Sequence, residues 1–394
     1  MIDFELSPEE ETVIAEARRQ AEIYRTYAPK FDHTQDWTIP HARLFFIPEE
    51  ASFPHVRNLA RSVRGRNDAT PGDVIDALIY LEENWGAKVF RPRGEDGDNF
   101  EYWISKKLLR AAGTPEQVER VADKNISVAW AMTEPGVGSD PATMITTARW
   151  DEATSEWVIN GEKMFISGPS QSADIVVMAR AFGKELDGVV TPFIVSRQNP
   201  GLSVGKQLHK LGLRSWDTAG LALIDCRVRD DDRLLGGLRN ALEIFNSTRG
   251  LIGAQALGLA RAAIDIVRGT LAAQGVAIDY SLPLSAQPAI VDRFIKLEEL
   301  YESSWLTLVN AEWHKSKGNA NQYPTLCKFV CAGAARRIIR ECIVLLGQDA
   351  TSDAYFLEQA LRDARICDIY EGSGEVLRLY IARWLFGLKK NELN

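Results

Sequence analysis

The spacing of hydrophobic and polar residues changes character twice along the chain. In the first third, apolar residues recur at helical spacing behind the helix-start signals Ser-Pro-Glu-Glu at 7–10 and Thr-Pro-Gly-Asp at 70–73. A Thr-Pro-Glu-Gln run at 114–117 begins a further short helix, and the polar, Gly-rich stretch at 91–98 predicts a loop. We therefore expect a helical N-terminal domain over residues 1–125.

Near residue 126 the pattern changes to short runs that favour strands. Residues 157–166 form two such runs around Asn160-Gly161, which is a strong β-hairpin signal. The further strand candidates are 174–182, 191–196 and 220–228. Because Gly, Pro and Asp separate these runs at short intervals, the pattern predicts a compact antiparallel β domain over residues 126–236.

From residue 238 the spacing is helical again to the end of the chain. The helix candidates are 248–271, 290–317, 324–346 and 355–365. Their lengths and short connections suit a four-helix, up-and-down bundle over residues 237–394, and the small residues of the first candidate permit close helix packing. Strands do not alternate with helices, so the order predicts an α+β fold rather than an α/β parallel sheet.

Composition narrows the class of protein. The chain has 394 residues, of which 45% are hydrophobic and 25% charged, as in ordinary soluble proteins. A net charge of -8 disfavours a nucleic-acid partner, which needs a basic face. The five Cys form no CxxC pair and the five His no ligand spacing, which predicts reduced thiols in a cytoplasmic protein and no metal site. The N-terminus lacks the pattern of a signal peptide, and no apolar run is long enough to predict a membrane span.

The segment Ile-Tyr-Glu-Gly-Ser-Gly-Glu-Val at 369–376 is the first candidate for chemistry. Glu371 stands before Gly372, which can adopt backbone angles that other residues avoid. A carboxylate beside such a break can be aimed into a cavity, where it could act as a general base. Taken alone, the same pair is more often a solvated Glu at a helix end.

Two further stretches could hold a flat cofactor. In MTEPGVGSD at 132–140, an apolar strand runs into a Gly-rich turn whose N–H groups could receive phosphate or carbonyl oxygens, and the Thr133 hydroxyl could donate to a ring nitrogen. In MFISG at 164–168, Phe165 could stack on a ring and Ser167 could bond to it. Taken alone, the first stretch is a β-turn and Phe165 a core residue. Neither is a GxGxxG followed by a helix, so a Rossmann site is not predicted.

With LGLRSWDTAGLALIDCRV at 211–228, these stretches resemble, in order, four motifs of the acyl-CoA dehydrogenase family over residues 126–384. The resemblance implies FAD as cofactor and an acyl-CoA substrate that is oxidised to the trans-2-enoyl-CoA. A base removes the α-proton, the β-hydride leaves to the flavin, and an electron-transferring flavoprotein receives the electrons. It also implies a homo-oligomer, either a dimer or a tetramer.

The resemblance assigns Glu371 as the catalytic base. The flavin-binding positions are Trp130, Met132, Thr133, Gly138, Ser139, Phe165, Ser167 and Ser373. The substrate-binding positions are Ser139, Phe245, Asn246, Arg249, Tyr370 and Gly372. Some relatives carry the base immediately before the Arg that corresponds to Arg249. Thr248 occupies that position here and cannot serve as a base, which favours Glu371.

The chain departs from the family at positions that surround the cofactor. An Arg-x-x-Phe-Gly motif is replaced at Val276, Asp279 and Tyr280, and a Gly-Gly-x-Gly turn reads Gly-Gln-Asp-Ala at 347–350. Asp349 would repel a pyrophosphate. Residues 48–52 only faintly resemble the family's PEEYGG loop.

These departures leave several interpretations open. The chain is either a divergent dehydrogenase, or a half-site or non-catalytic subunit completed by a second chain, as in relatives that act on steroid side-chain thioesters. A flavin monooxygenase of the same fold is a further alternative, although it would not need Glu371. The motifs do not distinguish fatty-acid from steroid side-chain substrates.

Overall fold

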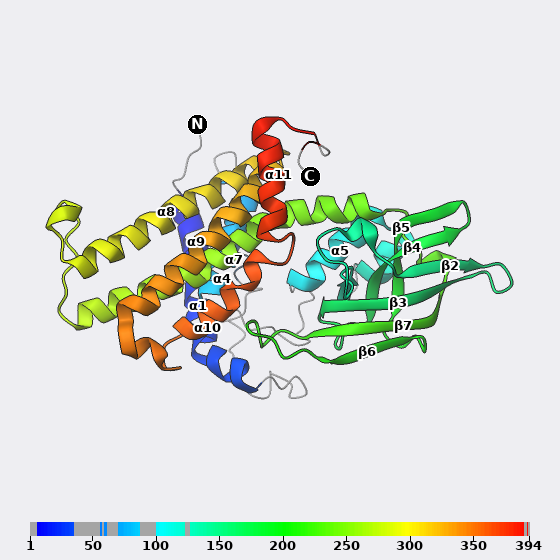
Figure 1. Cartoon of the computed structure of the whole chain (residues 1–394), viewed down its shortest axis with the longest axis horizontal. Coiled ribbons are helices and arrows are strands. Elements are labelled where there is room, and N and C mark those ends of the chain that lie inside the picture. Colours follow the sequence, from blue (N-terminus) through cyan, green and yellow to red (C-terminus); the bar gives the residue numbers. More distant parts are fainter. Residues whose placement is uncertain are drawn as a thin grey trace.

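The computed structural model describes residues 6–34, 56, 59–60, 70–86, 100–122, 127–389 and 392. The loop predicted at 91–98 and the segment 48–52 lie outside this part of the chain. Within it, helices at both ends of the sequence pack together on one side of the molecule, and a sheet lies on the other (Figure 1).

The described N-terminal helices are α1 (Pro8–Thr34), α4 (Gly72–Trp85), α5 (Phe100–Ala112) and α6 (Pro115–Gln117). The predicted helix starts are confirmed. The Ser7 hydroxyl accepts a hydrogen bond from the Glu10 backbone N–H at 3.3 Å, and Thr114 forms a capping box with Gln117. These caps satisfy N–H groups that have no partner within the helix.

The sheet contains seven described strands. They are β1 (Val128–Ala131), β2 (Thr147–Asp151), β3 (Glu156–Ser167), β4 (Asp174–Gly183), β5 (Leu186–Ser196), β6 (Leu202–Gln207) and β7 (Thr218–Arg229). Their order is β1-β4-β2-β3-β7-β6, with β5 on β4. Most pairings are antiparallel, whereas β1 and β2 each run parallel to β4.

The hairpin predicted around Asn160-Gly161 is wrong. β3 passes straight through these residues as one strand, with an irregularity between Ile159 and Gly161 where it pairs with β7. Gly161 has a φ of 153°, and a Cβ there would lie only 2.8 Å from the Cα of Thr146. The glycine is therefore required by the close approach of the chain at Thr146 and does not form a turn.

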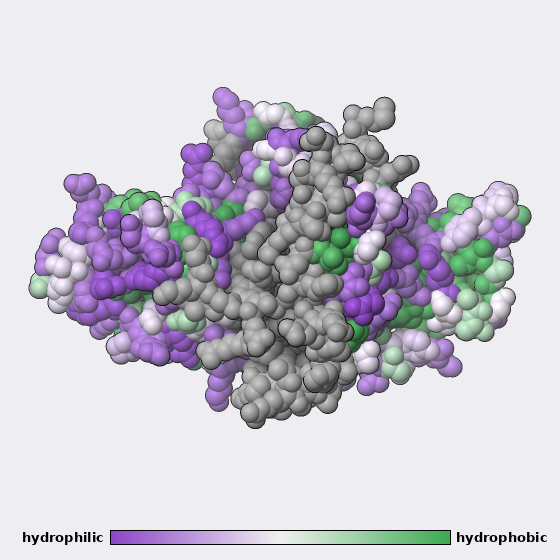
Figure 2. Space-filling view, turned by 180° about the vertical axis from the view of Figure 1, so that it is seen from behind, coloured by the Kyte–Doolittle hydropathy of each residue, from purple (hydrophilic) through white to green (hydrophobic). Residues whose placement is uncertain are grey.

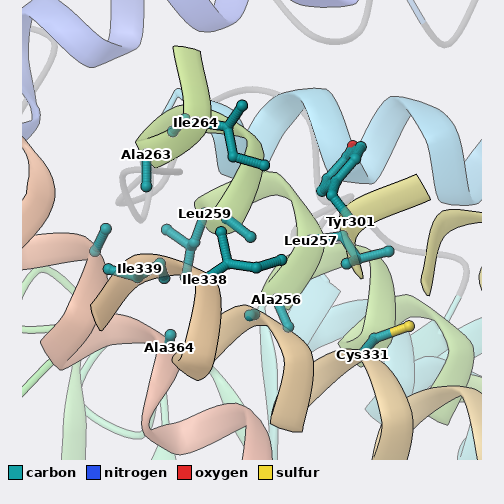
Figure 3. Packing of buried hydrophobic residues seen from close by; sticks show 14 of the residues in the cluster. Ala256, Leu257, Leu259, Ala263, Ile264, Tyr301, Cys331, Ile338, Ile339 and Ala364 are labelled. Carbon is teal, nitrogen blue, oxygen red and sulfur yellow. The ribbon is translucent and has the colours of Figure 1, made fainter. Parts of the chain in front are cut away.

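The C-terminal helices are α7 (Leu238–Ala273), α8 (Ala289–Ser316), α9 (Gln322–Leu346), α10 (Leu357–Ala364) and α11 (Gly374–Phe386). α7 is the central helix, and residues of α4, α8, α9 and α10 share its core (Figure 3). A Cβ at Gly253 would lie 2.7 Å from the Cys327 sulfur, so the small residues of α7 do permit close packing. α11 was not predicted from the sequence.

Among the described helices, α7 is long and apolar enough to cross a membrane by composition alone. However, 83% of its most apolar window is buried inside the protein, as expected for a core helix. The chain is thus an α+β protein with N-terminal helices, a β domain and a C-terminal helical bundle.

The connection between α7 and α8 carries one of the departures from the family motifs. Figure 2 shows apolar residues at the end of the molecule where these helices meet, farthest from the sheet. Tyr280 and Leu282 are exposed there, and the Tyr280 hydroxyl donates to the Glu298 carboxylate. At the other departure, Gly347–Thr351 forms a short 3-10 helix.

Candidate active site

Glu371 lies on a strained turn between two helical segments. The turn follows a 3-10 helix at Ile366–Asp368 and leads into α11. Glu371 has a φ of 55° and Gly372 a φ of 101°, both in the left-handed region. A non-glycine residue held in that region costs on the order of 1–3 kcal/mol, so the surrounding structure must impose this geometry. Ser373 then caps α11, because its hydroxyl accepts a hydrogen bond from the Val376 N–H.

Side chains from α7 and α9 hold the turn. Arg249 Nε donates to the Glu371 carbonyl oxygen at 3.0 Å, and Lys328 Nζ donates to the Gly372 carbonyl oxygen. The Tyr370 hydroxyl donates to the Oε1 of Gln255. Each anchor comes from a residue more than 40 positions away in the sequence. The tertiary structure therefore fixes where the Glu371 side chain starts.

Thr248 fixes the carboxylate itself. Its hydroxyl lies 2.8 Å from Glu371 Oε2 and 3.2 Å from the carbonyl oxygens of Ile244 and Phe245. Thr248 cannot act as a base, but it can orient one. The sequence did not predict this role, although the neighbouring Arg249 marked the position.

Burial raises the pKa of Glu371 to about 7, from an ordinary value of 4.5. The Thr248 hydrogen bond and the positive charges of Arg249, Lys328 and Lys107 oppose this rise, because each favours the ionised form. The carboxylate therefore titrates close to neutral pH. This is the range in which a general base is most effective.

Arg249 and Asn246, both predicted to bind substrate, are joined in one network. Arg249 Nη1 donates to Asn246 Oδ1 at 2.6 Å and to the Thr325 hydroxyl at 2.8 Å. The Asn246 amide donates to Asn321 Oδ1 at 2.9 Å. This network fixes the guanidinium that holds the Glu371 turn, so Arg249 has a structural role there in addition to the predicted contact with the substrate.

The second part of the site is built from β1, the turn after it and β3. A buried ion pair joins these elements, with Lys163 Nζ 2.9 Å from Glu134 Oε1. Lys163 also donates to the Met132 carbonyl, and the Met164 N–H donates to the Thr133 carbonyl at 2.9 Å. Met132 and Thr133, which the sequence predicts to bind the flavin, are thereby fixed to the strand that carries Phe165. Sequence reasoning missed both charged residues, although each lies inside a motif that it used.

Phe165 projects from the sheet instead of entering the core. Its side chain is 62% exposed, its φ is 61°, and it lies at an irregularity of β3 between Lys163 and Ile166. The interpretation of Phe165 as a core residue is therefore wrong. An exposed aromatic ring on strained backbone offers a face for stacking. Ser167 ends the same strand.

Trp130 and Phe245 connect the sheet to the helices near Glu371. Their rings are stacked, with centroids 4.7 Å apart and planes 3° from parallel. The indole Nε1 of Trp130 is buried without a hydrogen-bond partner in the described structure, which leaves a donor for a bound group. Phe245 precedes Thr248 by three residues on α7, so the stack lies about one helical turn from the residue that bonds to the Glu371 carboxylate.

The remaining predicted residues lie at the surface. Gly138 and Ser139 are exposed in the turn after β1, and a Cβ at Gly138 would approach nothing closer than 4.0 Å. The β-turn before them is closed by two hydrogen bonds between Glu134 and Val137. Among the described residues, no group of three or more His, Cys, Asp or Glu could hold a metal ion.

Comparisons with known proteins agree with this architecture. The sequence matches the acyl-CoA dehydrogenase middle domain over residues 129–226 and the acyl-CoA dehydrogenase C-terminal domain over residues 236–386. It is 31% identical over 289 residues to the acryloyl-CoA reductase (NADH) of Anaerotignum propionicum, covering 71% of this chain and 72% of that relative. It is 32% identical over 265 residues to the mitochondrial short-chain specific acyl-CoA dehydrogenase of Mus musculus, covering 64% and 61% of the two chains.

Solved structures share the fold over nearly the whole chain. A glutaryl-CoA dehydrogenase from Mycobacterium smegmatis has a TM-score of 0.78 at 22% identity, covering 98% of this chain and 97% of the other. Butyryl-CoA dehydrogenase from Megasphaera elsdenii has a TM-score of 0.77 at 20% identity, with 98% and 100% coverage. The chain belongs to the acyl-CoA dehydrogenase family, a family of oxidoreductases.

Proposed function

We propose that the protein is an FAD-dependent acyl-CoA dehydrogenase that converts an acyl-CoA thioester into the trans-2-enoyl-CoA. The proposal rests chiefly on Glu371, which combines a left-handed backbone, a Thr248 hydrogen bond to its carboxylate and a pKa of about 7. At neutral pH such a carboxylate is ionised in about half of the molecules, so it can both accept and later release a proton.

The chain's own residues prepare the removal of the α-proton. Glu371 accepts this proton, while Thr248 keeps the carboxylate oriented and Arg249 keeps the turn in place. The α-proton is too weakly acidic unless the thioester carbonyl is polarised, for which the family resemblance offers the Glu371 backbone N–H. A bound FAD would supply the acceptor for the hydride that leaves the β-carbon.

The residues around β1 and β3 fit a flavin. The unpartnered Trp130 indole N–H, the exposed Phe165 ring and the Thr133 hydroxyl supply a donor, a stacking face and a second donor. We propose that the cofactor is held by Trp130, Met132, Thr133, Gly138, Ser139, Phe165, Ser167 and Ser373. We propose that the substrate is bound by Ser139, Phe245, Asn246, Arg249, Tyr370 and Gly372.

The electron partner and the direction of the reaction are further parts of the proposal. One structure of the same fold, at a TM-score of 0.74, comes from work on the electron transferring flavoprotein of Acidaminococcus fermentans, and such a flavoprotein is the acceptor that we propose. Two relatives are named as reductases, of acryloyl-CoA and of 3-(aryl)acrylate. Reduction of a 2-enoyl thioester is therefore the second candidate function. We further propose a cytoplasmic homodimer or homotetramer.

Spectroscopy of the purified protein tests the proposal. We expect a flavin absorbance band that a panel of acyl-CoA thioesters bleaches in the absence of oxygen. Glu371→Gln should retain the band and lose at least about 1,000-fold in bleaching rate, because it lacks the base. Glu375→Gln changes an exposed carboxylate four residues away and should behave as the parent.

Other outcomes would favour the alternatives. Bleaching of Glu371→Gln at the parent rate would remove Glu371 from the mechanism. A colourless protein that takes up no flavin would favour a non-catalytic subunit. Oxygen consumption coupled to substrate hydroxylation would favour a monooxygenase. If 2-enoyl-CoA reoxidises the reduced flavin faster than acyl-CoA reduces the oxidised flavin, the reductive direction would be favoured.

A further inference from the structure

A buried lysine outside all of the sequence motifs contacts the turn that carries Glu371. Lys328 lies on α9, is fully buried, and donates from Nζ to the carbonyl oxygen of Gly372. Arg249 donates to the preceding carbonyl, that of Glu371, from α7. Two successive carbonyl groups of one turn are therefore each bound by a cation from a different helix.

We propose that Lys328 is a positioning residue for proton removal by Glu371, because it holds the turn in its left-handed conformation and places a positive charge beside the carboxylate. The inference rests on the function proposed above, in which Glu371 is the base. The first part of the inference, that Lys328 restrains the turn, can be tested without any substrate or flavin.

The need for such a hold follows from the backbone. Glu371 and Gly372 both have positive φ angles, and an unrestrained Glu would leave that region at once. A hydrogen bond from a charged donor is about twice as strong as one between neutral groups. Arg249 binds the Glu371 carbonyl and so restrains the peptide plane between Glu371 and Gly372. Lys328 binds the Gly372 carbonyl and restrains the next peptide plane, which leads into Ser373.

The charge of Lys328 has a use beyond the hydrogen bond. A buried ammonium group is unfavourable unless anionic groups compensate for it. The carboxylates that favour the charged form of Lys328 are those of Glu371 and Asp368, whereas Arg249 opposes it. Glu371 has the largest effect of these groups, so the main counter-charge of Lys328 is the carboxylate of the proposed base.

Lys328 is mostly charged at pH 7 and below, on the acid side of the Glu371 titration. Burial lowers the pKa of Lys328 to about 8, which is still above the value of about 7 for Glu371. The other charged groups that act on Glu371 are Arg249 from α7 and Lys107 from α5. All three cations favour the ionised carboxylate, and together they limit the rise in pKa that burial causes.

The pH dependence of substrate-induced bleaching tests the electrostatic part. In Lys328→Met, the acid limb of the profile should move up by about one pH unit or more, with roughly a tenfold loss of rate at pH 6. The reason is that the positive charge of Lys328, which lowers the pKa of Glu371, has been removed. Lys328→Arg retains the charge and should restore the acid limb of the parent. Arg340→Met removes an exposed charge from the same helix and should leave the profile unchanged.

Hydrogen exchange of the flavin-free protein tests the hold on the turn. Amide groups of residues 366–377 should exchange at least about tenfold faster in Lys328→Met than in the parent, and Lys328→Arg should return most of the protection. Lys328→Gln keeps an N–H donor without the charge and replaces the Met variant if that variant does not fold. It should shift the acid limb but retain part of the protection.

The two parts of the experiment separate this inference from the proposed function. If the parent bleaches with a thioester but Lys328→Met and Lys328→Gln keep its acid limb and its exchange rates, the role of Lys328 is overturned. If no thioester bleaches the parent, the proposed function fails, and the exchange rates alone then support or overturn the positioning role. A lower melting temperature with neither change would make Lys328 a packing residue only.

Discussion

The backbone of Glu371 has a φ of 55° and its carboxyl group titrates near pH 7, so neither resembles a surface Glu. Phe165 also has a positive φ and is exposed. Other described non-glycine residues with positive φ, such as Ser155 and Lys184, lie in turns between strands, where that geometry closes the turn. At Glu371 and Phe165 the positive φ instead sets the direction of the side chain. Strained backbone of this kind is common at functional sites.

The raised pKa of Glu371 makes a prediction about stability. The folded protein holds the proton of the Glu371 carboxyl group more tightly than the unfolded chain does. The protonated group therefore contributes its full stabilisation of the folded state below pH 4.5, and this stabilisation is lost as the pH rises through about 7. Glu371→Gln is neutral at every pH. The free energy of unfolding of Glu371→Gln should therefore exceed that of the parent by near zero at low pH and by at most roughly 3 kcal/mol above pH 8.

Chemical denaturation at pH 5.5 and pH 8.5 measures this difference. Glu375→Gln, which removes an exposed carboxylate from the next helix, should show the same gap from the parent at both values. A constant gap for Glu371→Gln as well would mean that the carboxyl group of Glu371 has an ordinary pKa in the folded protein.

At the level of elements, the strands that we propose to bind the flavin depend on one buried ion pair. Glu134 and Lys163 have no exposed side-chain surface, and Glu134 also accepts hydrogen bonds from the N–H groups of Ile145 and Thr146. The pair thus joins the turn after β1, the start of β2 and the middle of β3. Each partner would be left as an unpaired buried charge without the other.

Lys163→Met should therefore destabilise the protein by about 3–5 kcal/mol and weaken flavin retention, because it leaves the Glu134 carboxylate buried without a cation. Denaturant titration and the flavin content after gel filtration measure the two effects. The double variant Glu134→Gln with Lys163→Met should be less damaged than Lys163→Met alone. Lys184→Met, at a pair with Asp230 whose side chains are 37% and 33% exposed, should lose at most about 1 kcal/mol.

Local signals explain what the sequence could predict at this scale. The starts at Ser7 and Thr114 were predictable because each cap bonds to a residue three positions away. Gly161 was misread as a turn because its conformation depends on the close approach of Thr146, which lies next to β2. Lys328 was missed because its acceptor, Gly372, lies 44 residues further on. Glu371 could be proposed as the base because the motif that contains it is contiguous in the sequence.

Across the whole molecule, Arg362 of α10 joins three distant segments. Its guanidinium binds Asp32 of α1, the carboxylate of Glu358 on its own helix, and the carbonyl of Leu211. The connection that contains Leu211 is packed so tightly on α10 that a Cβ at Gly212 would lie 2.2 Å from the Arg362 carbonyl oxygen. Arg362 therefore holds α1, the segment after β6 and the helix that leads to the Glu371 turn at one point.

Loss of this junction should affect segments far apart in the sequence together. Among the described residues, Arg362→Met leaves the buried Asp32 with Arg214 as its only cation, 3.8 Å away. We therefore expect a loss of roughly 3 kcal/mol and faster hydrogen exchange in the last turns of α1 and in residues 208–217. Arg365→Met, three residues later at a more exposed pair with Asp368, should lose less than about 1 kcal/mol. Faster exchange confined to α10 would show that Arg362 stabilises its own helix only. Joint loss of protection in both remote segments, with the exchange of β3 unchanged, would show that α10 couples the N-terminal helix to the segment after β6.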